Sequence, residues 1–326
     1  MTPSEQIRQA IEKANHVLVI THISPDGDAF GSLTAVGQVL SQWNKKFSLV
    51  CDDPPPNRFY YLPLVDTVLT KPKTDAYYDL VIAVDCGDQK RMGQAFACLS
   101  EPKPFVINID HHVTNTEFGE INLINPVATS ATEMLYELFA GWQVRLTADI
   151  ALSLLTGLVT DTLGFRTDGV TANTLRIASS LVEAGADLQL VTMQGLKIKP
   201  LSTLRLWQLG LNNMKLENGL LWTSISNEDL KNIGYTNASS AGLVNILSDV
   251  YQAAMGVVLL EMDDGAVQVG FRCHPPYNVS ELAANLGGGG HPLAAGCKLD
   301  GPLAKAESLV VQLSKEAIRQ QMNGHR

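Results

Sequence analysis

Short apolar runs alternate with amphipathic segments along the first half of the chain. Four runs are apolar at nearly every position, which is typical of strands covered on both faces of a sheet; they span residues 16–22, 47–53, 79–88 and 104–112. Periodic patterns predict helices over residues 31–43, 132–142, 148–161 and 171–186. Strands that alternate with helices in this way predict a doubly wound, parallel α/β sheet.

The pattern changes after Gly185, a residue that suits a helix end. We expect residues 187–200 to connect two domains, the first over 1–186 and the second over 201–326. In the second half the pattern predicts strands over 220–226, 256–262 and 266–273 and a terminal helix over 303–322. A DDG tripeptide at 263–265 predicts a hairpin turn. The second domain is therefore expected to be a smaller α/β domain.

Composition narrows the class of protein. A length of 326 residues suits about two domains, and 45% apolar residues are enough for a hydrophobic core. The net charge of −9 argues against a broad basic track for long nucleic acid, because Lys and Arg contacts to phosphates carry that affinity. A small anionic substrate in a local pocket stays compatible with this charge.

Cysteine usage and targeting signals indicate the compartment. Five cysteines without a CxxC pair suit a reducing environment. The first fifteen residues read as an amphipathic helix and not as a signal peptide. No apolar stretch approaches the roughly 18 residues of a membrane helix. We therefore expect a cytoplasmic protein with no membrane contact.

Acids and histidines gather where the predicted strands end. Open α/β sheets bind ligands at the carboxyl ends of their strands, and the parallel arrangement brings those ends to one edge. The residues concerned are His22, Asp26, Asp28, Asp85, Asp110, His111, His112 and, at a helix end, Asp161. So many carboxylates at one place would repel unless cations neutralised them. Mixed histidine and carboxylate ligands suit Mn²⁺, Zn²⁺ or Fe²⁺ better than Ca²⁺ or Mg²⁺.

Each element has an ordinary interpretation when taken alone. Pro-Asp-Gly at 25–27 is a common turn, Asp28 suits a helix cap, and a His-His pair after a strand is often structural. Arg91 and the pair Thr132–Glu133 fit the starts of helices, and we leave them out of the predicted site residues. An EF-hand, a P-loop and a dinucleotide fingerprint are absent from the sequence.

Taken together, the motifs resemble a known family. HISPDGDAFGS, VDCGD, IDHH and GLVTDTLGF occur in the order and approximate spacing of the four motifs of the DHH phosphoesterase superfamily. GGGGHPLAAG in the second half resembles the DHHA1 domain that accompanies one branch of it. The subgroup that the chain resembles contains nano-RNases (oligoribonucleases) and 3′-phosphoadenosine 5′-phosphate phosphatases.

The resemblance implies a dinuclear manganese centre in a cleft between the two domains. It divides the metal ligands into His22, Asp26 and Asp85 for one ion, and Asp28, Asp85, His111 and Asp161 for the other. Asp110 would orient a histidine of the centre, as carboxylates beside metal ligands commonly do. His112 would face the substrate phosphate or the attacking hydroxide.

The resemblance also gives the second domain a role in substrate binding. Gly288, Gly289 and Gly290 would let the backbone approach a phosphate. His291 would line the same site, and Arg272 would pair with a terminal phosphate through its bidentate fork. A flexible loop for the glycines and a surface position for Arg272 are the alternatives.

These implications define the expected function. The chain would use two Mn²⁺ ions to hydrolyse very short RNA and dinucleotides such as pApA, and 3′-phosphoadenosine 5′-phosphate to AMP and phosphate. The alternatives are a cyclic dinucleotide phosphodiesterase, a manganese-dependent pyrophosphatase or a single-strand exonuclease of the same superfamily, and a nucleotide sensor without turnover. The sequence is compatible with a monomer or a homodimer and does not choose between the nucleotide substrates.

Overall fold

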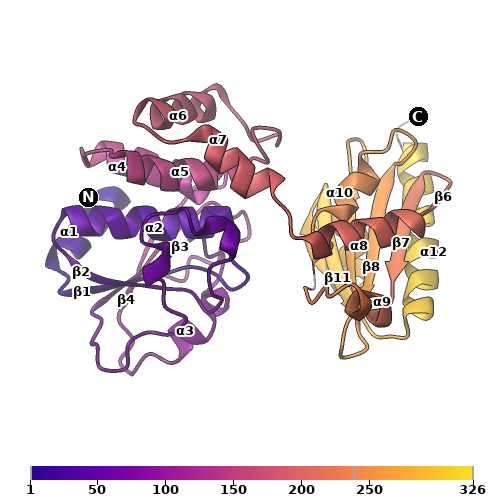
Figure 1. Ribbon diagram of the computed structural model, residues 1–326, viewed down its shortest axis with the longest axis horizontal. Coiled ribbons are helices and arrows are strands. Elements are labelled where there is room, and N and C mark those ends of the chain that lie inside the picture. The colour runs from indigo at the N-terminus through magenta and orange to yellow at the C-terminus, as the bar shows by residue number, and fades with distance from the viewer. Residues whose placement is uncertain (1, 238, 325–326) are drawn as a thin grey trace. The chain divides into compact units, whose positions relative to one another are not determined.

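The chain divides into two compact units, Met1–Ile198 and Lys199–Arg326 (Figure 1). The structure is a computed structural model and describes residues 2–237 and 239–324. Each unit has its own sheet and its own hydrophobic core.

A five-stranded parallel sheet forms the centre of the first unit. The strand order is β2-β1-β3-β4-β5, with β1 (His16–Ile20), β2 (Lys46–Val50), β3 (Leu80–Val84), β4 (Phe105–Asp110) and β5 (Ile121–Ile124). The first four confirm the strands predicted from the apolar runs. β5 is not among the predicted strands, because its four residues lie at the sheet edge and are only half-buried.

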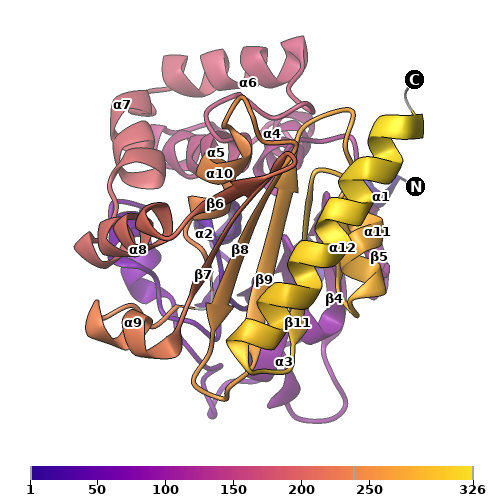
Figure 2. The ribbon, with the colours of Figure 1, turned by 90° about the vertical axis from the view of Figure 1, so that its right-hand side faces the viewer.

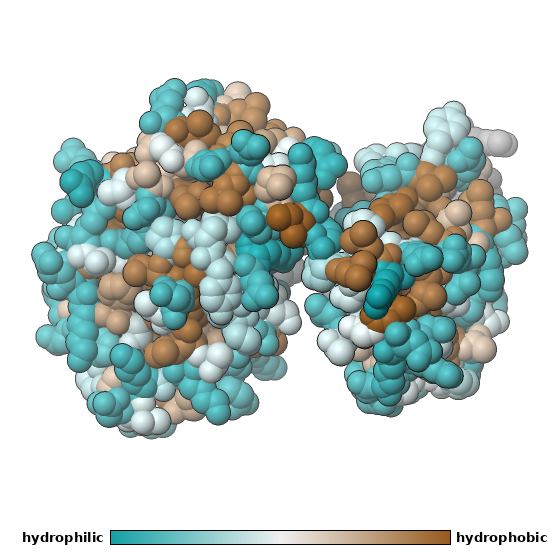
Figure 3. Space-filling view, viewed as in Figure 1, coloured by the Kyte–Doolittle hydropathy of each residue, from teal (hydrophilic) through white to brown (hydrophobic). Residues whose placement is uncertain are grey.

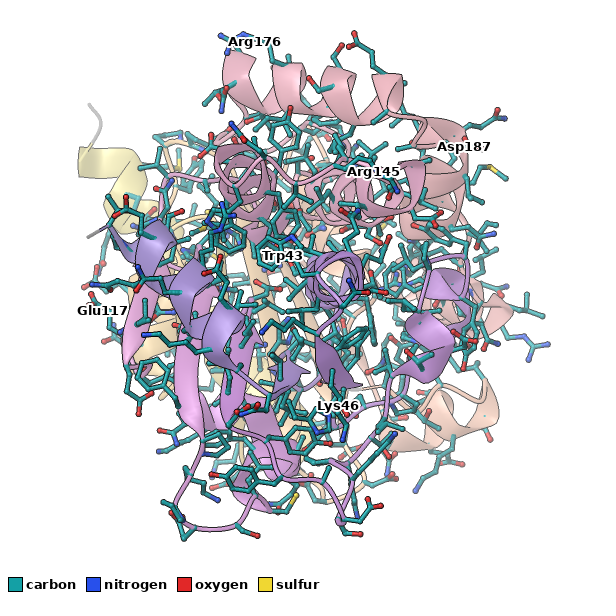
Figure 4. All side chains as sticks on the ribbon, turned by 90° about the vertical axis from the view of Figure 1, so that its left-hand side faces the viewer. Trp43, Lys46, Glu117, Arg145, Arg176 and Asp187 are labelled. Atoms are coloured by element: carbon teal, nitrogen blue, oxygen red, sulfur yellow. The ribbon has the colours of Figure 1, made fainter. Side chains whose placement is uncertain are left out.

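Helices cover both faces of this sheet, which confirms the doubly wound fold (Figure 1). One face packs against α1 (Pro3–Lys13), α2 (Gly27–Gln42), α4 (Ala131–Gly141) and α5 (Ala148–Asp161). The other face packs against the 3₁₀ turn η3 (Gln89–Met92) and α3 (Gly93–Ala97). α6 (Ala172–Glu183) packs on α5 further out, and Arg176 on it lies at the periphery in Figure 4. Two more 3₁₀ turns are η1 (Asn57–Phe59) and η2 (Val65–Thr67).

The start of α2 differs from the prediction. The helix begins at Gly27, four residues before the predicted start, and Asp26 is its N-cap. The Asp26 carboxylate accepts hydrogen bonds from the backbone N–H groups of Asp28 and Ala29. The interpretation of Asp28 as the cap is therefore wrong, because Asp28 lies within the first turn.

Residues 187–200, expected to connect the two domains, are largely helical. They form α7 (Leu188–Val191) and a π-helical turn, η4 (Thr192–Lys197), before α8 begins at Leu201. The first twelve residues of the segment, 187–198, belong to the first unit, where η4 contacts α5.

The second unit contains a six-stranded mixed sheet in the order β10-β11-β9-β8-β7-β6, in which only β7 and β8 run parallel. The strands are β6 (Lys215–Glu217), β7 (Leu220–Ile225), β8 (Met255–Glu261), β9 (Val267–Cys273), β10 (Gly289–His291) and β11 (Ala294–Leu299). β7, β8 and β9 confirm the predicted strands. Gly265 at φ +76° confirms the hairpin turn between the last two.

Helices cover both faces of the second sheet as well. α11 (Ser280–Asn285) and α12 (Leu303–Gly324) pack on one face, and Figure 2 shows α12 running along it. α8 (Leu201–Asn212), α9 (Asn227–Asn232) and α10 (Leu243–Ser248) pack on the other. Hydrophilic and hydrophobic side chains are interspersed on the faces seen in Figure 3. Within residues 2–237 and 239–324 no helix is long and apolar enough to cross a membrane.

Candidate metal centre

The acids and histidines singled out in the first half meet at one edge of the first unit's sheet. Asp85 directly follows β3, and His22 lies two residues beyond β1, its neighbour in the sheet. β4 ends in Asp110, with His111 and His112 next in the chain. Asp26 and Asp28 stand at the start of α2, and Asp161 is the last residue of α5, which packs against α2. Four separate segments of the chain therefore supply one cluster.

Asp85 is at the centre of this cluster. His22 Nε2 lies 3.3 Å from Asp85 Oδ2, and His111 Nε2 lies 3.7 Å from Asp85 Oδ1. The same His111 nitrogen is 3.9 Å from Asp28 Oδ2 and 3.5 Å from Asp161 Oδ2. Asp85 therefore faces the histidines that follow two different strands.

Three groups of these residues could each hold a metal ion. They are His22, Asp26 and Asp85; Asp28, His111 and Asp161; and Asp85, His111 and His112. Within each group the candidate ligand atoms lie within 4.8 Å of one another. The first two groups together contain all six predicted metal ligands. The third adds His112, for which we predicted a role beside the phosphate and not at the metal.

The buried carboxylates provide a test of whether a cation suits the site. Asp85 Oδ1 is buried and makes no hydrogen bond to any described residue. Burial, and then the neighbouring acid Asp28, raise the pKa of Asp85 well above its usual value. Burial also raises the pKa of Asp28 and raises that of Asp161 to about 9. A divalent cation would reverse these effects and satisfy the unpaired oxygen, so these residues fit a metal.

The backbone of Asp85 supports this interpretation. Its φ is +57°, in the left-handed region that residues other than glycine rarely adopt. Such a conformation costs on the order of 1–3 kcal/mol and is frequent at functional sites. It turns the chain at the end of β3, where the side chain meets His22 and His111.

Asp28 is held by the start of another helix. Its carboxylate accepts hydrogen bonds from the backbone N–H groups of Ala131 (2.6 Å) and Thr132 (3.0 Å), and from the Thr132 hydroxyl (2.7 Å). These donors fix the position of both carboxylate oxygens. Sequence reasoning missed Thr132, because the helix-start pattern explains a threonine there and nothing in the spacing pairs it with a residue over 100 positions earlier.

The two histidines after β4 have different partners. His112 Nδ1 lies 2.7 Å from Asp110 Oδ1, and Asn115 donates to the other Asp110 oxygen at 2.6 Å. Burial alone would raise the pKa of Asp110, but these hydrogen bonds and the nearby histidines bring it below its usual value. His111 Nδ1 instead lies 3.2 Å from the Ala128 carbonyl oxygen. Asp110 therefore orients His112 and not His111.

In the second unit, the predicted phosphate-binding residues lie on or beside β9 and the edge strand β10. His291 on β10 pairs with Ala294 on β11, and Ala294 pairs with Arg272 on β9. Directly opposed residues of antiparallel strands present their side chains on the same face, so Arg272 and His291 share a face two strands apart. Gly290 has φ +145°, and a Cβ there would lie 2.5 Å from the Ala294 carbonyl oxygen, so only glycine fits.

Two of the three predicted glycines lie in a strand and not in a flexible loop. Gly289 and Gly290 belong to β10, and Gly288 precedes it with Gly296 close by. All three are exposed. Arg272 is half-buried, and burial lowers the pKa of its guanidinium from the usual value.

This chain, with its two α/β units and its centre of acids and histidines at the carboxyl edge of a parallel sheet, belongs to the DHH–DHHA1 family of phosphoesterases. The family model for the DHH family, N-terminal domain, matches residues 16–158, and the DHHA1 domain model matches residues 224–320. The chain is accordingly a hydrolase that acts on phosphoester bonds.

Particular relatives make the family membership more specific. The chain is 31% identical over 325 residues to the bifunctional oligoribonuclease and PAP phosphatase NrnA of Thermus thermophilus, covering 96% of this chain and 93% of the relative. A solved structure of an exopolyphosphatase-related protein from Bacteroides fragilis has a TM-score of 0.85 and 24% identity, covering 98% of this chain and 96% of that chain. RecJ of Thermus thermophilus in complex with Mn²⁺ has a TM-score of 0.54 and 13% identity, covering 98% and 54%. The two structures show that the fold is shared.

Proposed function

We propose that this chain hydrolyses very short oligonucleotides, such as the dinucleotide pApA, to mononucleotides in a reaction that depends on divalent metal. Release of phosphate from 3′-phosphoadenosine 5′-phosphate is the proposed second activity. The observation that carries the proposal is the cluster around Asp85, where a buried oxygen, Oδ1, makes no hydrogen bond and lies 3.7 Å from His111 and 3.6 Å from His112. The similarity to a protein named oligoribonuclease and PAP phosphatase supports the choice of substrates.

Two Mn²⁺ ions are the proposed cofactors. His22, Asp26 and Asp85 would hold one ion, and Asp28, His111 and Asp161, with Asp85 shared, the other. When bound, such ions lower the pKa of a water molecule and stabilise negative charge on a phosphoryl group. The mixture of imidazole and carboxylate ligands suits Mn²⁺, Zn²⁺ or Fe²⁺. The similarly folded RecJ structure with Mn²⁺ is a reason to test manganese first.

Protein groups beside the ligands would position the substrate. Asp110 accepts a hydrogen bond from His112 Nδ1, so Nε2 donates to a phosphoryl oxygen only in the imidazolium form, which carries a hydrogen on both nitrogens. A hydrogen bond aimed at charge that develops during the reaction lowers the barrier. Arg272 and His291 of the second unit are proposed to bind the phosphate end of the nucleotide, together with Gly288, Gly289 and Gly290.

The charge of the chain favours short substrates over long ones. Proteins that track along single strands combine basic grooves with stacking aromatic residues. This chain has 24 Lys and Arg against 33 Asp and Glu, and 6% aromatic residues. Binding through one terminal phosphate needs few basic groups, which agrees with a dinucleotide substrate.

A substrate panel tests the proposal. Metal-stripped full-length protein would be supplied with Mn²⁺ and offered pApA, 3′-phosphoadenosine 5′-phosphate, pyrophosphate, a cyclic dinucleotide and a longer single strand, and mononucleotide and phosphate would be quantified. We expect fastest turnover of pApA and loss of at least a thousandfold in Asp85→Ala, because removal of a central metal ligand takes away the metal chemistry. An Asp85→Ala protein that turns over pApA at the wild-type rate would refute the proposal.

The other outcomes of the panel identify the alternatives. Preference for pyrophosphate, the cyclic dinucleotide or the long strand would assign the chain to another activity of the superfamily. Tight binding of pApA without release of mononucleotide would indicate a nucleotide sensor.

A further inference from the structure

The guanidinium of Arg91 lies against a predicted metal ligand. Nη2 of Arg91 is 2.9 Å from Nδ1 of His22. Arg91 belongs to η3, the 3₁₀ turn after β3, whereas His22 follows β1. In the described part of the chain the Arg91 side chain makes no other hydrogen bond or ion pair.

Hydrogen bonds hold both the carbonyl oxygen and the N–H group of Arg91. Its carbonyl oxygen accepts from the N–H of Ile23, the residue after His22, at 2.8 Å. Its own N–H donates to the carboxylate of Asp88, the N-cap of η3, at 3.2 Å. The backbone of Arg91 therefore stays beside His22 even if the contact of the guanidinium with His22 is broken, which keeps the guanidinium within reach of the metal centre.

The contact between Arg91 and His22 requires one arrangement of the imidazole hydrogen. Arginine carries only N–H donors and no acceptor, so the contact is a hydrogen bond only when Nδ1 of His22 accepts. The ring hydrogen then lies on Nε2, which faces Asp85 Oδ2 at 3.3 Å. In that arrangement Nε2 has no lone pair for a cation.

Metal binding requires the opposite arrangement. A histidine that binds a cation through Nε2 carries its hydrogen on Nδ1 and donates it to a nearby oxygen. The structure provides this oxygen, because the Ile23 carbonyl lies 2.8 Å from Nδ1 of His22. Nδ1 then no longer accepts from Arg91. Pairing of His22 with Arg91 and binding of a cation by His22 therefore exclude each other.

We propose that Arg91 binds a phosphoryl oxygen of the substrate, and that a cation at His22, Asp26 and Asp85 releases it to do so. This inference rests on the proposed function, whose substrate carries the phosphate. The released guanidinium is half-buried and has lost its acceptor, which is unfavourable. Phosphoryl oxygens replace that acceptor and match the planar fork of arginine.

A coupling between metal and substrate follows from this exchange. A cation that frees Arg91 strengthens phosphate binding, and phosphate that holds Arg91 strengthens cation binding by the same factor. The metal-free protein would bind nucleotide weakly, because its arginine is occupied by His22.

The test measures binding of AMP, the expected product, to full-length protein with and without Mn²⁺ by calorimetry, with adenosine as the phosphate-free probe. Affinity for Mn²⁺ alone is measured by electron paramagnetic resonance of the free ion. The variants are Arg91→Gln, Arg91→Lys and the control Lys90→Gln, which removes a charge from the neighbouring exposed residue. Melting temperatures establish that each variant folds.

We expect Arg91→Gln to weaken AMP binding to the Mn²⁺-loaded protein by about tenfold to a hundredfold, the effect of one charge-assisted hydrogen bond. It should leave adenosine binding unchanged and bind Mn²⁺ at least as tightly as the wild type, because the neutral glutamine amide can accept a hydrogen bond from Nδ1 as well as donate one. Arg91→Lys should be intermediate, since lysine keeps the charge without the fork. Lys90→Gln should behave as the wild type.

Two results would overturn the inference. One is an Arg91→Gln protein that binds Mn²⁺ much more weakly but AMP normally, which would make Arg91 a support for His22 alone. The other is wild-type AMP affinity that does not depend on Mn²⁺. A substrate panel without pApA turnover would refute the proposed function and leave the Arg91 result standing, so the two failures are distinguishable.

Discussion

At the scale of single residues, the centre consists of carboxylates whose environments differ. Asp28 receives three hydrogen bonds from α4, whereas one oxygen of Asp85 receives none. Asp110 lies beside the centre and pairs with His112. The protein thus fixes some oxygens by its own donors and leaves others for a cation, which is how residues around a metal centre orient its ligands.

Replacement of Thr132 should weaken metal binding. Thr132→Val keeps the shape of the side chain but removes the hydroxyl that donates to Asp28 Oδ1. We expect a loss of about 10–100-fold in Mn²⁺ affinity, typical for partners of metal ligands, measured by titration calorimetry. Thr132→Ser restores the hydroxyl and is the control; equal affinity in the two variants would contradict the role of this hydrogen bond.

Metal removal should make stability depend on pH. The pKa of Asp161 is raised to about 9 and that of Asp85 is raised above its usual value, so between pH 4 and 9 the folded metal-free protein binds more protons than the unfolded chain. Stability then falls as pH rises through this window. Thermal melts in chelator should give a lower melting temperature at pH 8.5 than at pH 5.5.

Two comparisons check this origin of the pH dependence. Added Mn²⁺ should raise the melting temperature more at pH 8.5 than at pH 5.5. Asp161→Asn in chelator should flatten the profile, because the amide does not ionise. If Asp161→Asn leaves the pH dependence of the melting temperature unchanged, that dependence arises from other residues of the chain.

At the scale of elements, the apolar runs predicted four strands of the first sheet, because strands buried on both faces need apolar residues at every position. The start of α2 was predicted too late, because the helix begins in the polar turn itself and Asp26 serves as its cap. The half-buried edge strand β5 has no such signal. The close packing of α2, α4 and α5 around Asp28 also could not be predicted, since it depends on contacts between distant segments.

A glycine of α5 tests this packing. A Cβ at Gly157 would lie 2.3 Å from Asp28 Oδ1 and 2.4 Å from the Thr132 methyl group. Gly157→Ala should therefore destabilise the protein by about 1–3 kcal/mol, as expected for overpacking, and weaken Mn²⁺ binding. Denaturant unfolding and calorimetry would measure the two effects.

The matched control for Gly157→Ala is a glycine at a helix end with open space. Gly141 is the last residue of α4, and a Cβ there would meet nothing within 4 Å. Gly141→Ala should be neutral or stabilise by up to about 1 kcal/mol, because alanine favours the helix. Similar effects of the two substitutions would argue against close packing at Gly157.

At the scale of the whole molecule, the two units have separate sheets and separate cores. All six predicted metal ligands belong to the first unit, and Arg272 and His291 belong to the second. Metal binding is therefore expected from the first unit alone, whereas hydrolysis of nucleotides is expected to need both.

A shortened chain tests this division. Residues 1–198 should fold and bind Mn²⁺ with an affinity within about tenfold of the full chain, the range expected when only the surroundings of the ligands change. The same fragment should lose pApA turnover. Circular dichroism would establish folding, and a folded fragment that binds no Mn²⁺ would show that the second unit contributes to the metal centre.

The sequence by itself determined the parallel sheet and the types of residue at its carboxyl edge, because both are encoded in local patterns and in short motifs. The tertiary structure decided which atoms of these residues contact one another. The left-handed turn at Asp85 and the pairing of Asp110 with His112 instead of His111 are local geometries that the motif letters do not specify. The donors from Thr132 to Asp28 and the contact of Arg91 with His22 join residues of different segments. Such contacts depend on how strands and helices pack, and spacing along the chain carries no record of them.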